Sequence, residues 1–243
     1  MATQPPSLLP NLASRLQSLI ESLQSNPNIS VTEAAIGEPA TQTEIREARR
    51  AAGGYLPPGL EEFYSQVGSF KLEWAYNGPE LLAPSASELS WSDLALRGTV
   101  DIIPITEIFA GWKGGGWEGI LWFPTGDEDE DEDEESWRYT YRHLKPIDMF
   151  IPEAYTVLVG PKDKTEGARF SDHVAYHYCG EGLEETRYTF AEYVERMIVC
   201  RGYWYWVTSL CASEVERGSL EVQELKTVAP QIFPDMDLDL FVP

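Results

Sequence analysis

Apolar residues recur at helical spacing at the start of this chain. Between residues 8 and 25, the leucines Leu9, Leu12, Leu16, Leu19 and Leu23 follow one another at intervals of three or four. This spacing places them on one face and predicts an amphipathic helix of about four turns. The Asn-Pro-Asn sequence at 26–28 ends the pattern. We interpret 28–40 as a linker with a short strand at 29–31.

Three further helices carry end signals as well as a buried face. Thr41 and Glu44 fit a capping box, and so do Thr189 and Glu192 before the apolar residues of 190–198. A third helix follows the Leu-Pro-Pro sequence at 56–58, and we expect Pro58 in its first turn.

Strands are predicted in the middle of the chain. Residues 70–76 alternate between apolar and polar side chains, and Pro104 favours an edge or an end for the strand at 100–105. Residues 214–228 read as helical and 235–241 as a tail. Because strands and helices do not alternate regularly, we expect an α+β fold. The remaining strands are predicted at 120–123, 137–141, 155–159 and 173–178.

Two segments resemble a known family. The first runs from Thr43 to Ala48 and continues with Leu56-Pro57-Pro58-Gly59-Leu60-Glu61-Glu62-Phe63-Tyr64. The second is Phe190-Ala191-Glu192-Tyr193-Val194-Glu195-Arg196-Met197-Ile198 with the Arg-Gly-Tyr-Trp-Tyr-Trp sequence of 201–206. Together they resemble the SUKH superfamily, which contains fungal Smi/Knr cell-wall regulators and bacterial toxin-immunity proteins. The resemblance covers about residues 41–207.

The resemblance implies a curved, mostly antiparallel sheet with helices packed around it and no enzymatic activity. To this we add an N-terminal helix and a C-terminal tail. The expected organisation is an N-terminal arm and helix at 1–40, a SUKH-like domain at 41–210 and a C-terminal extension at 211–243.

The net charge of the chain disfavours some classes of function. The chain has 40 acidic and 18 basic residues among 243, a formal charge of −22. Without its one acidic run, 31 acidic residues still oppose 18 basic ones. This argues against nucleic acid and against a polybasic membrane contact. No apolar stretch reaches the length of a membrane span, no signal peptide is evident, and three cysteines lack metal-site spacing. We expect a cytoplasmic protein.

The acidic run is the first candidate partner-binding segment. Adjacent carboxylates repel one another and must stay solvated, so the run either steers a basic partner or serves as a solubilising loop. Calcium binding is a third option, although EF-hand spacing is missing. The run, an acidic loop at 127–135 within the domain, consists of Asp127, Glu128, Asp129, Glu130, Asp131, Glu132, Asp133, Glu134 and Glu135.

Tryptophans are the second candidate. Trp112 and Trp117 lie in a glycine-rich segment at 111–119, where they either anchor a protein partner or pack onto the sheet. Aromatic residues elsewhere should mostly fill the core, with one or two lining a partner groove on the open face of the sheet. These are Trp74, Tyr76, Trp204 and Trp206.

Catalytic and metal chemistry has little support. His173, His177 and Cys179 share one strand face, which is compatible with zinc, but a fourth ligand is missing and a half-buried strand explains the same pattern. The chain lacks Gly-x-Ser-x-Gly and His-Glu-x-x-His motifs. We therefore expect no enzyme, no cofactor and no metal.

These observations lead to one expected function and one alternative. The first is an immunity protein that binds and occludes a basic toxin domain, with nucleases among the toxins that would fit. The alternative is a regulatory or scaffold protein of the Smi/Knr type without a toxin partner. The sequence leaves the oligomeric state open.

Overall fold

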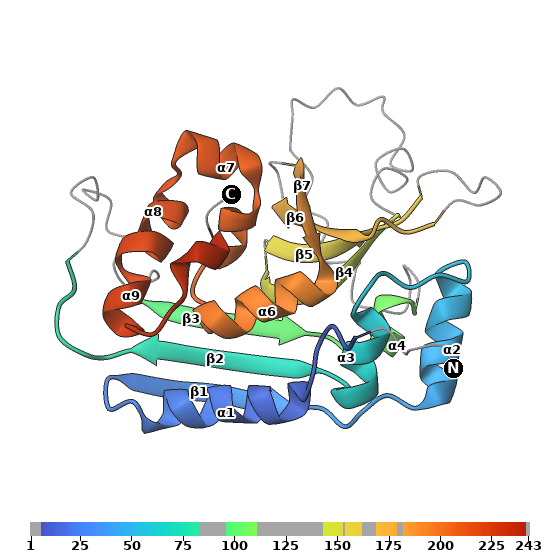
Figure 1. The fold of residues 1–243 in the computed structure, drawn as a ribbon, viewed down its shortest axis with the longest axis horizontal. Helices are drawn as coiled ribbons and strands as arrows, with labels where there is room; N and C mark the ends of the chain where they lie inside the picture. Colours follow the sequence, from blue (N-terminus) through green and yellow to red (C-terminus); the bar gives the residue numbers. More distant parts are fainter. Residues whose placement is uncertain are drawn as a thin grey trace, which may run out of the picture.

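A seven-stranded antiparallel sheet organises the chain (Figure 1). The computed structural model describes residues 6–82, 96–110, 143–152, 154–161, 169–178 and 182–241. Within these ranges the strand order along the sheet follows the chain from β1 to β7, and the sheet does not close. The α+β class and the antiparallel sheet expected from the sequence are confirmed. The strands are β1 (Ile29–Ile36), β2 (Phe70–Tyr76), β3 (Arg97–Ile102), β4 (Leu144–Ile151), β5 (Ala154–Val159), β6 (His173–Tyr178) and β7 (Gly182–Thr189).

Helices surround this sheet, and Figure 1 shows α1 and α6 in front of it. One large hydrophobic core joins both helices to the strands, and it includes Leu16, Trp74, Tyr193 and Phe241. The helices are α1 (Leu12–Ser25), α2 (Gln42–Ala51), α3 (Leu60–Gln66), α4 (Ile105–Ile108), α6 (Phe190–Cys200), α7 (Ala212–Arg217), α8 (Leu220–Thr227) and α9 (Ala229–Ile232), with 3₁₀ turns η2 (Trp206–Leu210) and η3 (Leu238–Phe241).

Both predicted capping boxes are present. The Thr41 hydroxyl accepts the Glu44 amide at the start of α2, and the Thr189 hydroxyl accepts the Glu192 amide at the start of α6. The prediction for Pro58 is wrong, because α3 begins after Gly59. Gly59 has a φ of 86°, and an added Cβ would lie 2.6 Å from the Cβ of Ala191. Glycine permits this close approach of α3 to α6.

Strand predictions were less complete. β1 extends to Ile36, well beyond the short strand expected at 29–31, while β4 and β7 were not predicted at all. β4 is apolar without alternation and contains Pro146, so its sequence lacks the period of a half-buried strand. Of the two positions that Pro104 favoured, the edge is wrong because β3 is an interior strand, and the end is confirmed because β3 stops at Ile102. The strands predicted at 120–123 and 137–141 lie outside the described residues.

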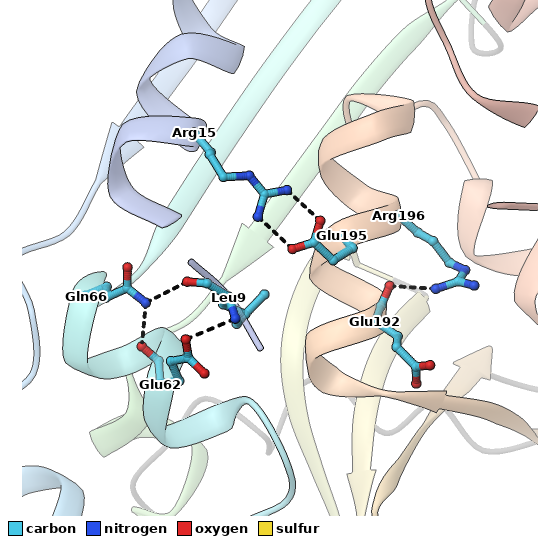
Figure 2. A network of polar contacts seen from close by, with 7 residues as sticks. All are labelled: Leu9, Arg15, Glu62, Gln66, Glu192, Glu195 and Arg196. Atoms are coloured by element: carbon cyan, nitrogen blue, oxygen red, sulfur yellow. Dashed lines mark hydrogen bonds and ion pairs between the residues drawn. The ribbon is translucent and has the colours of Figure 1, made fainter. Parts of the chain in front are cut away.

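The N-terminal helix is capped from another helix (Figure 2). Its own flanking residue, Asn11, provides no side-chain cap. Instead, the Glu62 carboxylate accepts the amides of Leu8 and Leu9, and Gln66 Oε1 accepts the amide of Leu12 at 2.9 Å. The Gln66 contact satisfies an amide hydrogen that a helix start leaves open, and the Glu62 contacts fix the residues before α1 to α3.

Contacts with α6 hold the same helix from the other side. The Arg15 guanidinium donates two hydrogen bonds to the Glu195 carboxylate, at 2.6 and 2.5 Å (Figure 2). At the other end of the chain, the C-terminal extension folds back onto the core, where Leu225, Phe233 and Phe241 are buried. The N-terminal helix and the C-terminal extension therefore share one hydrophobic core with the sheet.

Candidate functional site

The face of β1–β3 that points away from the core is polar. Phe70, Leu72 and Trp74 of β2 are buried in the core, so the intervening Lys71 and Glu73 point to the opposite side. There the Lys71 ammonium lies 3.3 Å from the Glu33 carboxylate and 3.8 Å from the Asp101 carboxylate. We call this side the open face.

The sheet divides between β3 and β4. These strands have a single registered Cα pair, Ile102 with Asp148. Toward its other end β3 bonds instead to the segment that follows α6: the Thr99 amide donates to the carbonyl of Gly202 at 2.8 Å, and the Trp204 amide donates to the carbonyl of Arg97 at 2.9 Å. Residues 202–204 thus form a wedge between the two strands, and we call this division the fork.

A groove of about 360 Å³ lies at the mouth of the fork. Trp204 is its aromatic wall. The Arg97 guanidinium carbon lies 3.5 Å from the centroid of the Trp204 ring, and the Tyr205 ring packs edge-on against Trp204 at 5.0 Å. These two contacts fix the indole, as expected of a preorganised binding anchor. The lining also includes Thr32, Glu73, Thr99, Phe150 and Pro152.

Glu73 is the carboxylate in this groove that makes no hydrogen bond or ion pair with any described residue. The neighbouring acids Glu33 and Asp101 both approach Lys71. The groove hydroxyls are also engaged, since Thr32 Oγ1 donates to the carbonyl of Glu73 at 3.3 Å and Thr99 Oγ1 donates to the carbonyl of Phe150 at 3.1 Å. Glu73 is therefore placed to receive a positive charge from outside.

The structure does not test the site residues predicted from the sequence. Trp112, Trp117 and the acidic run 127–135 lie outside the described residues. The expectation for the other aromatic residues fits better: Trp74 and Trp206 are each 2% exposed, whereas Trp204 is partly exposed and lines the groove. What the sequence did not indicate is the wedge at 202–204, because it depends on pairing between distant segments.

Histidines and cysteines form no metal site in the described part of the chain, where no group of three His, Cys, Asp or Glu side chains could hold a metal ion. His173 is exposed, while His177 is buried and stacks on Tyr155 at 6.5 Å. Burial lowers the pKa of His177. Burial also raises the pKa of Cys211 to about 12, so its thiol stays protonated at neutral pH. Cys179 lies outside the described residues.

Asp148 lies where β3 and β4 still pair, at the closed end of the fork, which we call the throat. The sequence did not point to this residue. Its side chain is fully buried. Oδ1 accepts the Asp101 amide at 2.7 Å and Oδ2 accepts the Tyr193 hydroxyl at 2.6 Å, while Thr156 Oγ1 lies 3.1 Å from the Tyr193 oxygen. Burial raises the pKa of Asp148 to about 7, although these two donors oppose the rise. The sequence feature that could have pointed to Asp148 is a single acidic residue within the mostly apolar sequence of 144–151.

Comparison of the chain with protein-family models, curated proteins and solved structures found no match in any of the three. None of the helices in the described ranges has the length and apolar character needed to cross a membrane.

Proposed function

We propose that this chain is a non-enzymatic binding protein, and specifically an immunity protein whose open face occludes a basic toxin domain. The groove beside Trp204 is the observation that carries the proposal. It combines a fixed indole, a carboxylate that makes no hydrogen bond or ion pair with any described residue and a polar floor, a composition suited to the centre of a protein interface.

Charge supports a basic partner. The chain as a whole carries −22, which favours association with a positively charged surface and speeds the encounter. On the open face, the three carboxylates of Glu33, Glu73 and Asp101 surround Lys71. A lysine or arginine of the partner inserted beside Glu73 would gain both a charge partner and the edge of an aromatic wall. The toxin identity of that partner rests on the SUKH resemblance.

Co-expression tests this function. The chain would be produced together with the toxin-like protein encoded beside it, and both cell survival and co-purification would be scored. We expect the wild type to protect cells, and Trp204→Ala combined with Glu73→Gln to lose both protection and co-purification. Glu47→Gln is the matched control because Glu47 is exposed on α2 outside the groove lining.

Three outcomes would contradict the proposal in different ways. Absence of protection and of co-purification with the wild type would reject an immunity role. Co-purification of other cellular proteins, again lost in the groove variant, would favour the regulatory alternative with the same binding surface. Binding that persists in the folded groove variant would reject the groove as the interface.

A further inference from the structure

The fork has few direct links between its two arms. Besides the single registered pair, the Ile103 amide donates to the carbonyl of Ile147 at 3.1 Å, and Thr99 Oγ1 donates to the carbonyl of Phe150. In the third link, the side chain of Asp148 in β4 accepts the backbone amide of Asp101 in β3 at 2.7 Å. A fully buried carboxyl group thus takes a place that a backbone carbonyl fills in an ordinary ladder.

The groove lies two residues from this link along both strands. Thr99 precedes Asp101 by two positions in β3, and Phe150 follows Asp148 by two positions in β4. Both Thr99 and Phe150 line the groove. A change in the distance between β3 and β4 at Asp101 and Asp148 therefore also moves Thr99 and Phe150 in the groove.

The groups that face Asp148 determine what its charge costs. From β3 comes the Asp101 carboxylate, from α6 the Tyr193 hydroxyl and from β5 the Thr156 hydroxyl. On α3, Tyr64 donates to the carbonyl of Ile103 at 2.6 Å, and its hydroxyl is electrostatically coupled to Asp148 and to Glu107 of α4. None of the described cationic side chains forms an ion pair with Asp148, so an ionised carboxylate there is uncompensated by positive charge.

Two proton arrangements fit the same heavy-atom positions. With Asp148 ionised, Thr156 donates to Tyr193, and Tyr193 donates to Oδ2. When a proton from solvent binds Oδ2, the chain can reverse: Asp148 donates to the Tyr193 oxygen, and Tyr193 donates to Thr156 Oγ1. Oδ1 accepts the Asp101 amide in both arrangements. The neutral form therefore keeps every hydrogen bond and avoids the buried charge.

We infer that Asp148 is a proton-linked clasp of the fork: its neutral form holds β3 and β4 together, and its ionised form loosens the throat and changes the shape of the groove. Binding at the groove would then respond to pH near neutrality. This consequence rests on the proposed function of the groove, whereas the coupling between clasp and groove does not.

Nuclear magnetic resonance of the full chain between pH 5 and 9 tests the clasp without a partner. We expect the amide signals of Arg97, Thr99 and Ile151 and the indole signal of Trp204 to titrate with a common midpoint near 7. The burial that raises the pKa of Asp148 to about 7 sets this midpoint. In Asp148→Asn the shared titration should disappear, because asparagine imitates the neutral acid.

Two further variants keep Asp148 and move the midpoint. Tyr193→Phe removes a donor that stabilises the carboxylate, so the midpoint should rise by about one pH unit. Asp101→Asn removes a repelling charge, so the midpoint should fall. A purely structural role for Asp148 predicts neither shift, and these variants decide the question if Asp148→Asn does not fold.

His173 and His177 provide the control. Replacing either by glutamine should leave the groove titration in place. Groove signals that do not change with pH, or that titrate identically in Asp148→Asn, would overturn the clasp. That result would not affect the proposed binding role of the groove. Conversely, failure of the groove to bind a partner would not affect a measured titration.

Discussion

The Tyr193 hydroxyl of α6 lies 2.6 Å from the Asp148 carboxyl group of β4, and both side chains are completely buried. This contact fastens α6 to the strand at which the sheet divides. Its strength depends on the protonation of Asp148, since ionisation places a charge in the core.

The first prediction concerns stability and pH. The pKa of Asp148 is raised in the folded state to about 7 from an ordinary value of 3.8. Stability from the neutral acid is therefore complete below the unfolded pKa, and it is lost as the pH rises through 7. Asp148→Asn should gain stability relative to the wild type between pH 5 and 9, by up to roughly 4 kcal/mol.

Urea denaturation at several pH values measures this difference. Because the comparison is made between two chains at each pH, the repulsion among the other acidic residues largely cancels. A constant difference in the free energy of unfolding across this range would show that Asp148 does not change its charge there.

The second prediction concerns the N-terminal helix. Glu62→Ala removes the acceptor for the exposed amide of Leu8 and the partly buried amide of Leu9, and the loss of such a hydrogen bond costs about 0.5–1.5 kcal/mol each. We expect the variant to have a lower free energy of unfolding than the wild type. We also expect its hydrogen exchange to become faster, and the increase to be larger in α1 than in the sheet. Glu47→Ala, an exposed change on α2, is the control and should have little effect.

A third prediction tests the packing behind the groove. Gly98 lies so close to Trp74 that an added Cβ would stand 2.2 Å from the indole nitrogen. Gly98→Ala must displace Trp74, whose indole donates to the carbonyl of Arg201 at 2.7 Å, and should cost about 3 kcal/mol. At Gly218 the φ is 63° but the space is open, so Gly218→Ala should cost about 1 kcal/mol. Equal losses would contradict this account.

Local signals explain which parts of the fold were predictable. The capping boxes at Thr41 and Thr189 and the alternation of 70–76 operate within a few residues, so the sequence alone predicts α2, α6 and β2. The fork does not arise from local signals. It requires Trp204 to pair with Arg97 across more than a hundred residues, and β4 carries no period because it is buried almost throughout.

The candidate site also depends on contacts between residues that are far apart in the sequence. An indole at position 204 is visible in the sequence, but its exposure depends on the positive φ of Arg201, Gly202 and Tyr205, which turns the chain after α6. The contacts of Glu62 are equally hidden, because its carboxylate lies 54 and 53 positions away from the amides of Leu8 and Leu9 that it accepts.

The acidic run supplies a fourth prediction. Replacing 127–135 by glycine and serine should leave the free energy of unfolding nearly unchanged, because solvated charges contribute little to stability. If the run steers the partner, the association rate should fall and its dependence on salt should weaken. An unchanged association rate would reduce the run to a spacer.

The affinity of the co-purified partner for the groove tests the central claim most directly. Isothermal titration would compare the wild type, Trp204→Ala with Glu73→Gln, and Glu47→Gln, after circular dichroism has shown that all three are folded. We predict at least a tenfold rise in Kd for the groove variant and no change for Glu47→Gln. Equal Kd values for the wild type and the groove variant would contradict the account.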